Sequence, residues 1–126
     1  MRQALLVFFG SGVGGLARYA LGLWASRVWG PQFPWGTVAI NATGSFWIAV
    51  VIQLAWAGRL GPDARLALAT GLLGGFTTYS SFNQETLTLY QQAGAGAAAL
   101  NLGLTVLGCL VCGALGLTLG RAVAPG

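Results

Sequence analysis

Residues 74–85 read GGFTTYSSFNQE, a polar and hydroxyl-rich run within an otherwise hydrophobic chain. Of the 126 residues, 56% are hydrophobic and only 6% are charged, and there is no histidine. So few ionic groups cannot cover a surface that faces water, and the composition therefore predicts an integral membrane protein. Polar side chains inside a membrane are costly and mark functional positions. The 74–85 run is the first candidate for a functional site.

The apolar segments on either side of this run predict an all-α fold with four transmembrane helices. A span needs about 20 apolar residues, and clusters of Gly and Pro mark the turns between spans. We expect helices over residues 5–26, 36–57, 64–90 and 96–121. We also expect residues 1–126 to form a single domain, in which the first apolar segment belongs to the mature fold and is not a cleaved signal peptide.

The arginines give the expected orientation in the membrane. Positively charged loops are retained in the cytoplasm, and four helices place both termini and the middle loop on one side. That side collects more arginines than the other, with Arg2, Arg59, Arg65 and Arg121 against Arg18 and Arg27. The excess favours cytoplasmic termini, but it is small, so insertion in either direction stays open.

The third predicted helix carries a break. Gly74 and Gly75 are expected to interrupt it, and everything from Thr77 to Gln92 is too polar to face lipid. A broken helix survives in a membrane only where its freed backbone groups are buried in protein or line a cavity. The break therefore predicts an ion or ligand site at bilayer depth.

Beyond the break, helical spacing sorts the side chains onto faces. Tyr79 and Phe82 are three residues apart and share one face, while Ser81 and Glu85 are four apart and share another. Glu85 lies near the end of the helix. We expect it to cap the helix, to pair with an arginine or to accept hydrogen bonds from hydroxyl groups.

Two polar residues in the first two helices are each open to two interpretations. Arg18 either reaches the lipid headgroups through its long side chain or forms a vestibule that attracts anions. Asn41 either donates its two amide N–H groups to an anion or makes an interhelical hydrogen bond that only holds the bundle together.

Small residues form patterns of their own. Glycines spaced four apart predict close helix packing, and they occur as the pairs Gly10 with Gly14, Gly71 with Gly75, and Gly116 with Gly120. One side of the fourth helix is small and weakly polar. It is either a packing surface or the completion of a polar track, and it comprises Asn101, Thr105, Cys109, Cys112 and Gly116.

Three blocks of sequence closely resemble the Fluc fluoride channels, also called the CrcB family: residues 15–19 (GLARY), 36–46 (GTVAINATGSF) and 74–85. The resemblance covers essentially the whole chain. It implies an antiparallel dual-topology dimer of four-helix protomers, with two fluoride pores and a structural sodium ion at the breaks in the third helices. The partner in such a dimer is either an identical chain or a paired homologue.

The resemblance also implies roles for individual residues. Tyr79 and Phe82 stand where the family has two phenylalanines whose ring edges contact fluoride, and an aromatic edge carries the positive part of the ring quadrupole. Asn41 matches the pore amide. Gly74 and Thr77 match the residues whose backbone carbonyls bind sodium.

Further pore residues follow from the same resemblance. Ser81 and Thr105 would supply hydroxyl donors along the path. From their own positions in the helices, we further expect Arg18 to be a pore residue and Glu85 to lie at the pore end or to pair with another group. Two positions depart from the family pattern. Residue 79 is Tyr where the family has Phe, and an Asn stands at position 101, where an aromatic residue is common.

The expected function is passive export of fluoride through a selective channel in the cytoplasmic membrane, which gives fluoride resistance. Fluoride and lipid are the expected partners, without nucleic acid. An enzyme is not expected, because the chain has no lysine, no histidine and no nucleophile–base pair for acid–base chemistry. The alternative is a small dual-topology exporter of drugs or metabolites. Such exporters rely on an acid in the first helix, where this chain has only Arg18 as a charged residue.

Overall fold

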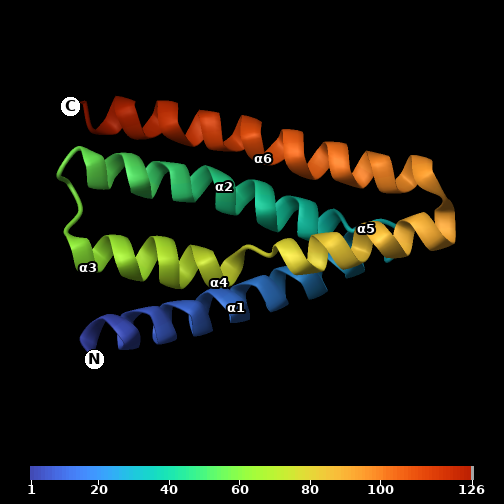
Figure 1. Ribbon diagram of the computed structural model, residues 1–126, viewed down its shortest axis with the longest axis horizontal. Coiled ribbons are helices and arrows are strands. Elements are labelled where there is room, and N and C mark those ends of the chain that lie inside the picture. Colours follow the sequence, from blue (N-terminus) through green and yellow to red (C-terminus); the bar gives the residue numbers. More distant parts are fainter. Residues whose placement is uncertain (126) are drawn as a thin grey trace.

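The computed structural model describes residues 1–125, which form a helical bundle without strands in that range (Figure 1). The chain crosses the bundle four times, and both termini lie at the same end of it (Figure 1). The third crossing consists of four consecutive segments, whereas each of the others is one helix. The elements are α1 (Arg2–Trp29), α2 (Trp35–Trp56), α3 (Pro62–Arg65), the π-helix η1 (Leu66–Leu73), α4 (Gly74–Phe76), α5 (Tyr79–Ala93) and α6 (Ala95–Val123).

The four predicted helical segments are found, with the third interrupted at Thr77 and Thr78, and their ends lie within a few residues of the predicted bounds. α1, α2 and α6 are each long and apolar enough to span a membrane. Large hydrophobic side chains are exposed along α1 and α6, among them Phe8, Leu16, Leu107 and Leu110. A water-soluble monomer rarely exposes so much contiguous apolar surface. The chain is therefore a multi-pass membrane protein.

Local sequence explains several helix ends. α3 starts with Pro62, whose fixed φ suits the first helical position, and Asp63 follows in the first turn, where a negative charge favours the helix dipole. α5 begins after Thr78, whose side-chain oxygen accepts a hydrogen bond from the Ser81 N–H at 3.3 Å. Gly94, with φ of 86°, ends α5 and lets the chain turn directly into α6.

The predicted glycine pairs lie where helices touch. A methyl group placed on Gly14 would lie 2.0 Å from the carbonyl oxygen of Leu72, and one on Gly116 would lie 2.2 Å from the carbonyl oxygen of Phe46. The backbones of α1 and η1, and those of α2 and α6, therefore meet at distances that admit no side chain. This confirms the prediction of close helix packing through small residues.

The prediction that Gly74 and Gly75 interrupt the helix was wrong, because both residues are helical within α4. A methyl group on Gly75 would lie 2.5 Å from the carbonyl oxygen of Ser11, so this glycine serves close contact with α1. The residues with extended backbone angles are Thr77 (φ −79°, ψ 156°) and Thr78 (φ −151°, ψ 116°), which separate α4 from α5.

Candidate functional site

Asn41 holds the backbone at the junction between α4 and α5. Its Nδ2 donates to the Thr78 carbonyl oxygen at 3.0 Å, and its Oδ1 accepts from the Thr78 N–H at 2.8 Å. In a continuous α-helix the Thr78 N–H would donate instead to the carbonyl four residues earlier, at Gly74. The amide of Asn41 therefore replaces helical bonding at this point. This is an interhelical hydrogen bond, and it uses one of the two amide N–H groups of Asn41.

Two backbone carbonyl groups near the junction, those of Leu73 and Gly75, accept hydrogen bonds from side chains. The Leu73 carbonyl accepts hydrogen bonds from both the N–H and the hydroxyl group of Thr77, at 3.0 and 2.9 Å. Arg18 donates from Nε to the Gly75 carbonyl at 3.2 Å. This arginine is therefore held within the bundle, at the carbonyl end of α4, where a positive charge favours the helix dipole.

Tyr79 and Phe82 lie in the first turn of α5, and their rings are in contact. The ring centroids are 5.7 Å apart and the ring planes are inclined by 64°, which confirms that the two side chains share a face. Phe82 is buried, whereas Tyr79 is 79% exposed. In this single chain, one ring therefore packs in the protein while the other faces outward.

A cavity of about 510 Å³ adjoins these rings, and we call it the Phe82 pocket. It brings together five of the predicted site residues, although they come from three crossings of the bundle: Asn41, Thr77, Tyr79, Phe82 and Thr105. The hydroxyl oxygen of Thr105 is buried and has no hydrogen-bond partner within residues 1–125. Thr105 thus forms part of the pocket wall, but its hydroxyl oxygen is not exposed to the open space.

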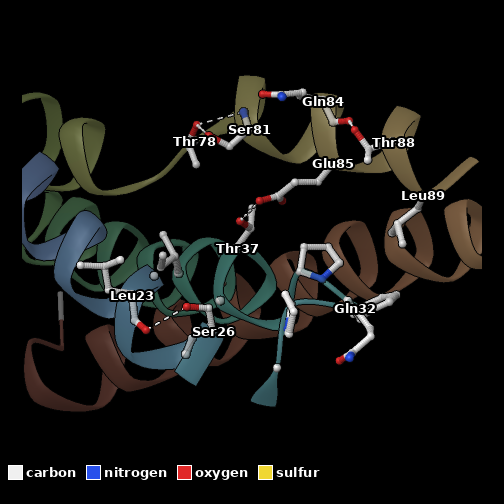
Figure 2. A pocket seen from close by; sticks show the side chains of 18 of the residues that line it. Leu23, Ser26, Gln32, Thr37, Thr78, Ser81, Gln84, Glu85, Thr88 and Leu89 are labelled. Atoms are coloured by element: carbon white, nitrogen blue, oxygen red, sulfur yellow. Dashed lines mark hydrogen bonds between the residues drawn. The ribbon is translucent and has the colours of Figure 1, made fainter. Parts of the chain in front are cut away.

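A second cavity of about 580 Å³ lies between α1, α2 and α5, and we call it the Glu85 pocket (Figure 2). Figure 2 shows the side chain of Glu85 reaching from α5 toward Thr37 on α2. The Thr37 hydroxyl donates to Glu85 Oε1 at 2.8 Å, so the predicted hydroxyl partner of Glu85 is found. The second carboxylate oxygen, Oε2, is buried without a partner in the described part of the chain. Arg18 and Ser81 also line this pocket.

The two pockets meet at Thr78, the one residue that lines both. Its hydroxyl group also donates to the Ser81 hydroxyl at 3.1 Å. Polar groups thus follow one another from the Glu85 pocket, past Thr78 and the amide of Asn41, to the aromatic rings of the Phe82 pocket. Gly74 is exposed and lines neither pocket.

Comparison with known proteins assigns the chain to a family. The sequence profile described as "CrcB-like protein, Camphor Resistance (CrcB)" matches residues 5–117. The chain belongs to the CrcB family. Relatives in that family are named "Fluoride-specific ion channel FluC". The relative from Anaeromyxobacter sp. strain K is 49% identical over 112 residues, which cover 88% of this chain and 89% of the relative.

Two further CrcB relatives match over almost their full length and bear the same name. The protein from Thermus thermophilus is 47% identical over 98% of this chain and 97% of its own length. The protein from Sorangium cellulosum is 39% identical, and the match covers all of both chains.

Thr37 and Thr78 are the site residues that the sequence analysis of this CrcB chain did not single out. Thr37 lies one helical turn before Asn41, so the two share a face of α2. That spacing was the available signal. Thr78 stands in the middle of the polar run, but only the fold shows that it separates the two pockets.

Proposed function

We propose that this chain is a fluoride-selective ion channel that exports fluoride passively across the cytoplasmic membrane. The observation that carries the proposal is the succession of polar groups past Thr78, from the Glu85 pocket to the Phe82 pocket, in an otherwise apolar bundle. Membership in a family with relatives named fluoride-specific channels identifies the ion.

The mechanism we propose is exchange of water for fixed hydrogen-bond donors. Fluoride is small and strongly hydrated, so donors must replace its water, while no single site holds it too tightly for conduction. Arg18 attracts the anion into the Glu85 pocket. Ser81 and the remaining N–H of Asn41 then replace water near Thr78. The ring edges of Phe82 and Tyr79 supply weak positive potential beyond that point.

We also propose that two chains assemble as an antiparallel dual-topology dimer with two pores. The large exposed area of Tyr79 supports this, because a pore-lining ring must be covered by something other than lipid. An inverted second copy would bring the two α4–α5 junctions together near the membrane midplane, like the inverted repeats of transporters. The second copy is an identical chain or a homologue.

A structural sodium ion at this dimer interface is part of the proposal. Because the Thr78 N–H binds Asn41, the Gly74 carbonyl lacks the helical bond that would otherwise occupy it. Helix C-terminal carbonyls and unwound backbone are sites that bind sodium in membrane proteins. The carbonyls of Gly74 and Thr77 from one chain are too few to surround a hard cation. The Gly74 and Thr77 carbonyls of the second copy would supply two further ligands. The ion would then offset the partial negative charges of the four carbonyls that face it.

Fluoride efflux from liposomes, followed with a fluoride electrode, tests the proposed function. We expect the purified protein to release fluoride but not chloride. Proton-driven dye efflux without fluoride efflux would indicate an exporter and overturn the proposal.

Asn41→Asp tests the route itself. A carboxylate at this position repels the anion and loses the donor to the Thr78 carbonyl, so we expect fluoride efflux to fall at least about a hundredfold, equivalent to about 2.7 kcal/mol on the barrier. Asn83→Asp is the matched control, since it places the same charge on an exposed position of α5 outside both pockets. Undiminished efflux by the Asn41 variant would remove this residue from the pore.

A further inference from the structure

Asn101 is the most deeply buried polar side chain of the described residues, at 1% exposure. It projects from α6 toward α5, where its Nδ2 donates to the Thr86 hydroxyl oxygen at 2.8 Å. The Thr86 hydroxyl in turn donates to the Phe82 carbonyl at 2.7 Å. The amide nitrogen is therefore paired, but the amide oxygen, Oδ1, has no partner among residues 1–125.

Thr105 lies one turn further along the same face of α6 and is 5% exposed. In α5 and α6 the other threonines each donate to a carbonyl of the preceding turn: Thr86 to Phe82, Thr88 to Gln84 and Thr118 to Leu115. Such local bonds are the usual way for a helical threonine to satisfy its hydroxyl group. Thr105 makes no such bond within the described chain. Its hydroxyl group is therefore available to a ligand.

The spacing of these two unpaired groups fits one small ligand. Side chains four residues apart on a helix have Cβ atoms about 5–6 Å apart, and two hydrogen bonds of about 2.8 Å cover that span. Buried polar groups are almost always paired, often by an ordered water molecule. Two deeply buried orphan groups on one helix face therefore point to a bound partner between them.

The chemistry of Asn101 Oδ1 decides which ligand that is. A carbonyl-type oxygen only accepts hydrogen bonds, so its partner must donate a proton. Fluoride has no proton to donate and would be repelled by this oxygen, whereas water both donates and accepts. We propose that a water molecule is bound between Asn101 Oδ1 and the Thr105 hydroxyl, in the seam of α5 and α6 behind Phe82.

This water gives Thr105 a role other than the one the sequence suggests. Its buried hydroxyl group binds the water behind the pocket wall instead of contacting fluoride in the pocket. Together, the water, Asn101 and Thr86 form a chain of hydrogen bonds that ends on the Phe82 carbonyl and fixes the first turn of α5. The site stands whether or not the chain conducts fluoride.

A double-mutant cycle tests whether the two residues share one ligand. We expect Asn101→Leu and Thr105→Val each to lower the midpoint of thermal unfolding in detergent by about 3–6 °C. The double variant should lose clearly less than the sum, because both single variants already lack the same water. Thr118→Val is the matched control, whose hydroxyl group bonds within its own helix on an exposed face. Additive losses would overturn the proposal.

A structure of the unmodified protein, at a resolution that shows ordered water, tests the ligand directly. Water and fluoride have equal numbers of electrons, so data are needed both with sodium fluoride and in fluoride-free buffer. We expect the same density between Asn101 and Thr105 under both conditions. Density that appears only with fluoride would identify an anion, and absence of density under both conditions would leave the site dry. Either result would overturn the proposal. Because this experiment uses the unmodified protein, it decides the question even if the variants do not fold.

Discussion

The two halves of the third crossing are built in different ways. η1 and α4 pack against α1 through glycines, with backbone against backbone and little room for adjustment. α5, which follows Thr77 and Thr78, buries Phe82 and Leu89 and also makes side-chain hydrogen bonds to α2 and α6, from Thr37 to Glu85 and from Asn101 to Thr86. The first half is fixed by shape and the second by polar pairing. The Glu85 pocket and the Phe82 pocket both lie along the second half, where polar side chains face the open space.

The largest expected effect is at the shape-fixed half. Gly14→Ala places a methyl group 2.0 Å from the Leu72 carbonyl, so one of the two packed backbones must shift. We expect a loss of about 3 kcal/mol in unfolding free energy, at the upper end of the range of about 1–3 kcal/mol that overpacking a tight contact commonly costs. The measurement is the thermal unfolding midpoint in detergent. Gly12→Ala, where no atom lies within 4 Å of the added methyl group, is the control. Equal midpoints for the two variants would contradict the close contact of α1 with η1.

Arg18→Gln is expected to have the next largest effect, and it acts where the two halves meet. The variant removes the only positive charge that lines the Glu85 pocket within residues 1–125. We expect fluoride efflux to fall about tenfold at about 0.15 M ionic strength and further at about 0.01 M, because screening is weaker there. Arg27→Gln, at an exposed site outside the pocket, is the control. A deficit that does not change with salt would indicate that Arg18 acts only through the Gly75 carbonyl.

The aromatic pair gives a smaller effect that separates ring from hydroxyl. Tyr79→Phe keeps the ring contact with Phe82, so we expect efflux within about threefold of the unmodified protein, less than about 0.7 kcal/mol on the barrier. Tyr79→Leu removes the ring and should cost about tenfold. The fluoride electrode measures both, with Tyr90→Phe on the same helix as control. If the Phe variant loses as much as the Leu variant, the hydroxyl group and not the ring is the functional part.

The smallest effect is expected at the end of the shape-fixed half, where Arg2 forms an ion pair with Asp63. Both side chains are substantially exposed, at 80% and 40%. Asp63→Asn should therefore change the unfolding free energy by less than about 1 kcal/mol, and the difference should disappear in about 1 M salt. A large, salt-independent loss would show that polar pairing also fixes this half.

Three of the four crossings, α1, α2 and α6, were predictable because the membrane imposes both helix length and apolar composition on them. The position of the non-helical residues was not. Gly74 and Gly75 are the obvious helix breakers by composition, but both are helical, and the small size of Gly75 serves contact with α1. The chain leaves the helix at Thr77 and Thr78, where Asn41, 37 residues earlier, binds the Thr78 backbone. A hydrogen bond between residues so far apart in the sequence leaves no pattern in the sequence around either of them.

In the candidate site, too, features set by local sequence were predictable, and features set by contacts between helices were not. The shared face of Tyr79 and Phe82 follows from helical spacing alone, and so was predicted. The partner of Glu85 was predicted only as a hydroxyl group, because Thr37 lies 48 residues away on another helix. The buried orientation of the Thr105 hydroxyl depends on how α6 is rotated against α5, which the apolar composition of α6 does not specify.

Thr78 is held twice, by Asn41 on its backbone and by its own side chain, which caps α5 through the Ser81 N–H. The residues that cap a helix start well are Ser, Thr, Asp, Asn and Gly, and all of them except glycine carry a side-chain oxygen. A helix that starts at this position therefore selects against apolar side chains at residue 78, whatever the chain transports. The polar character of the point where the two pockets meet is thus in part a consequence of helix stability.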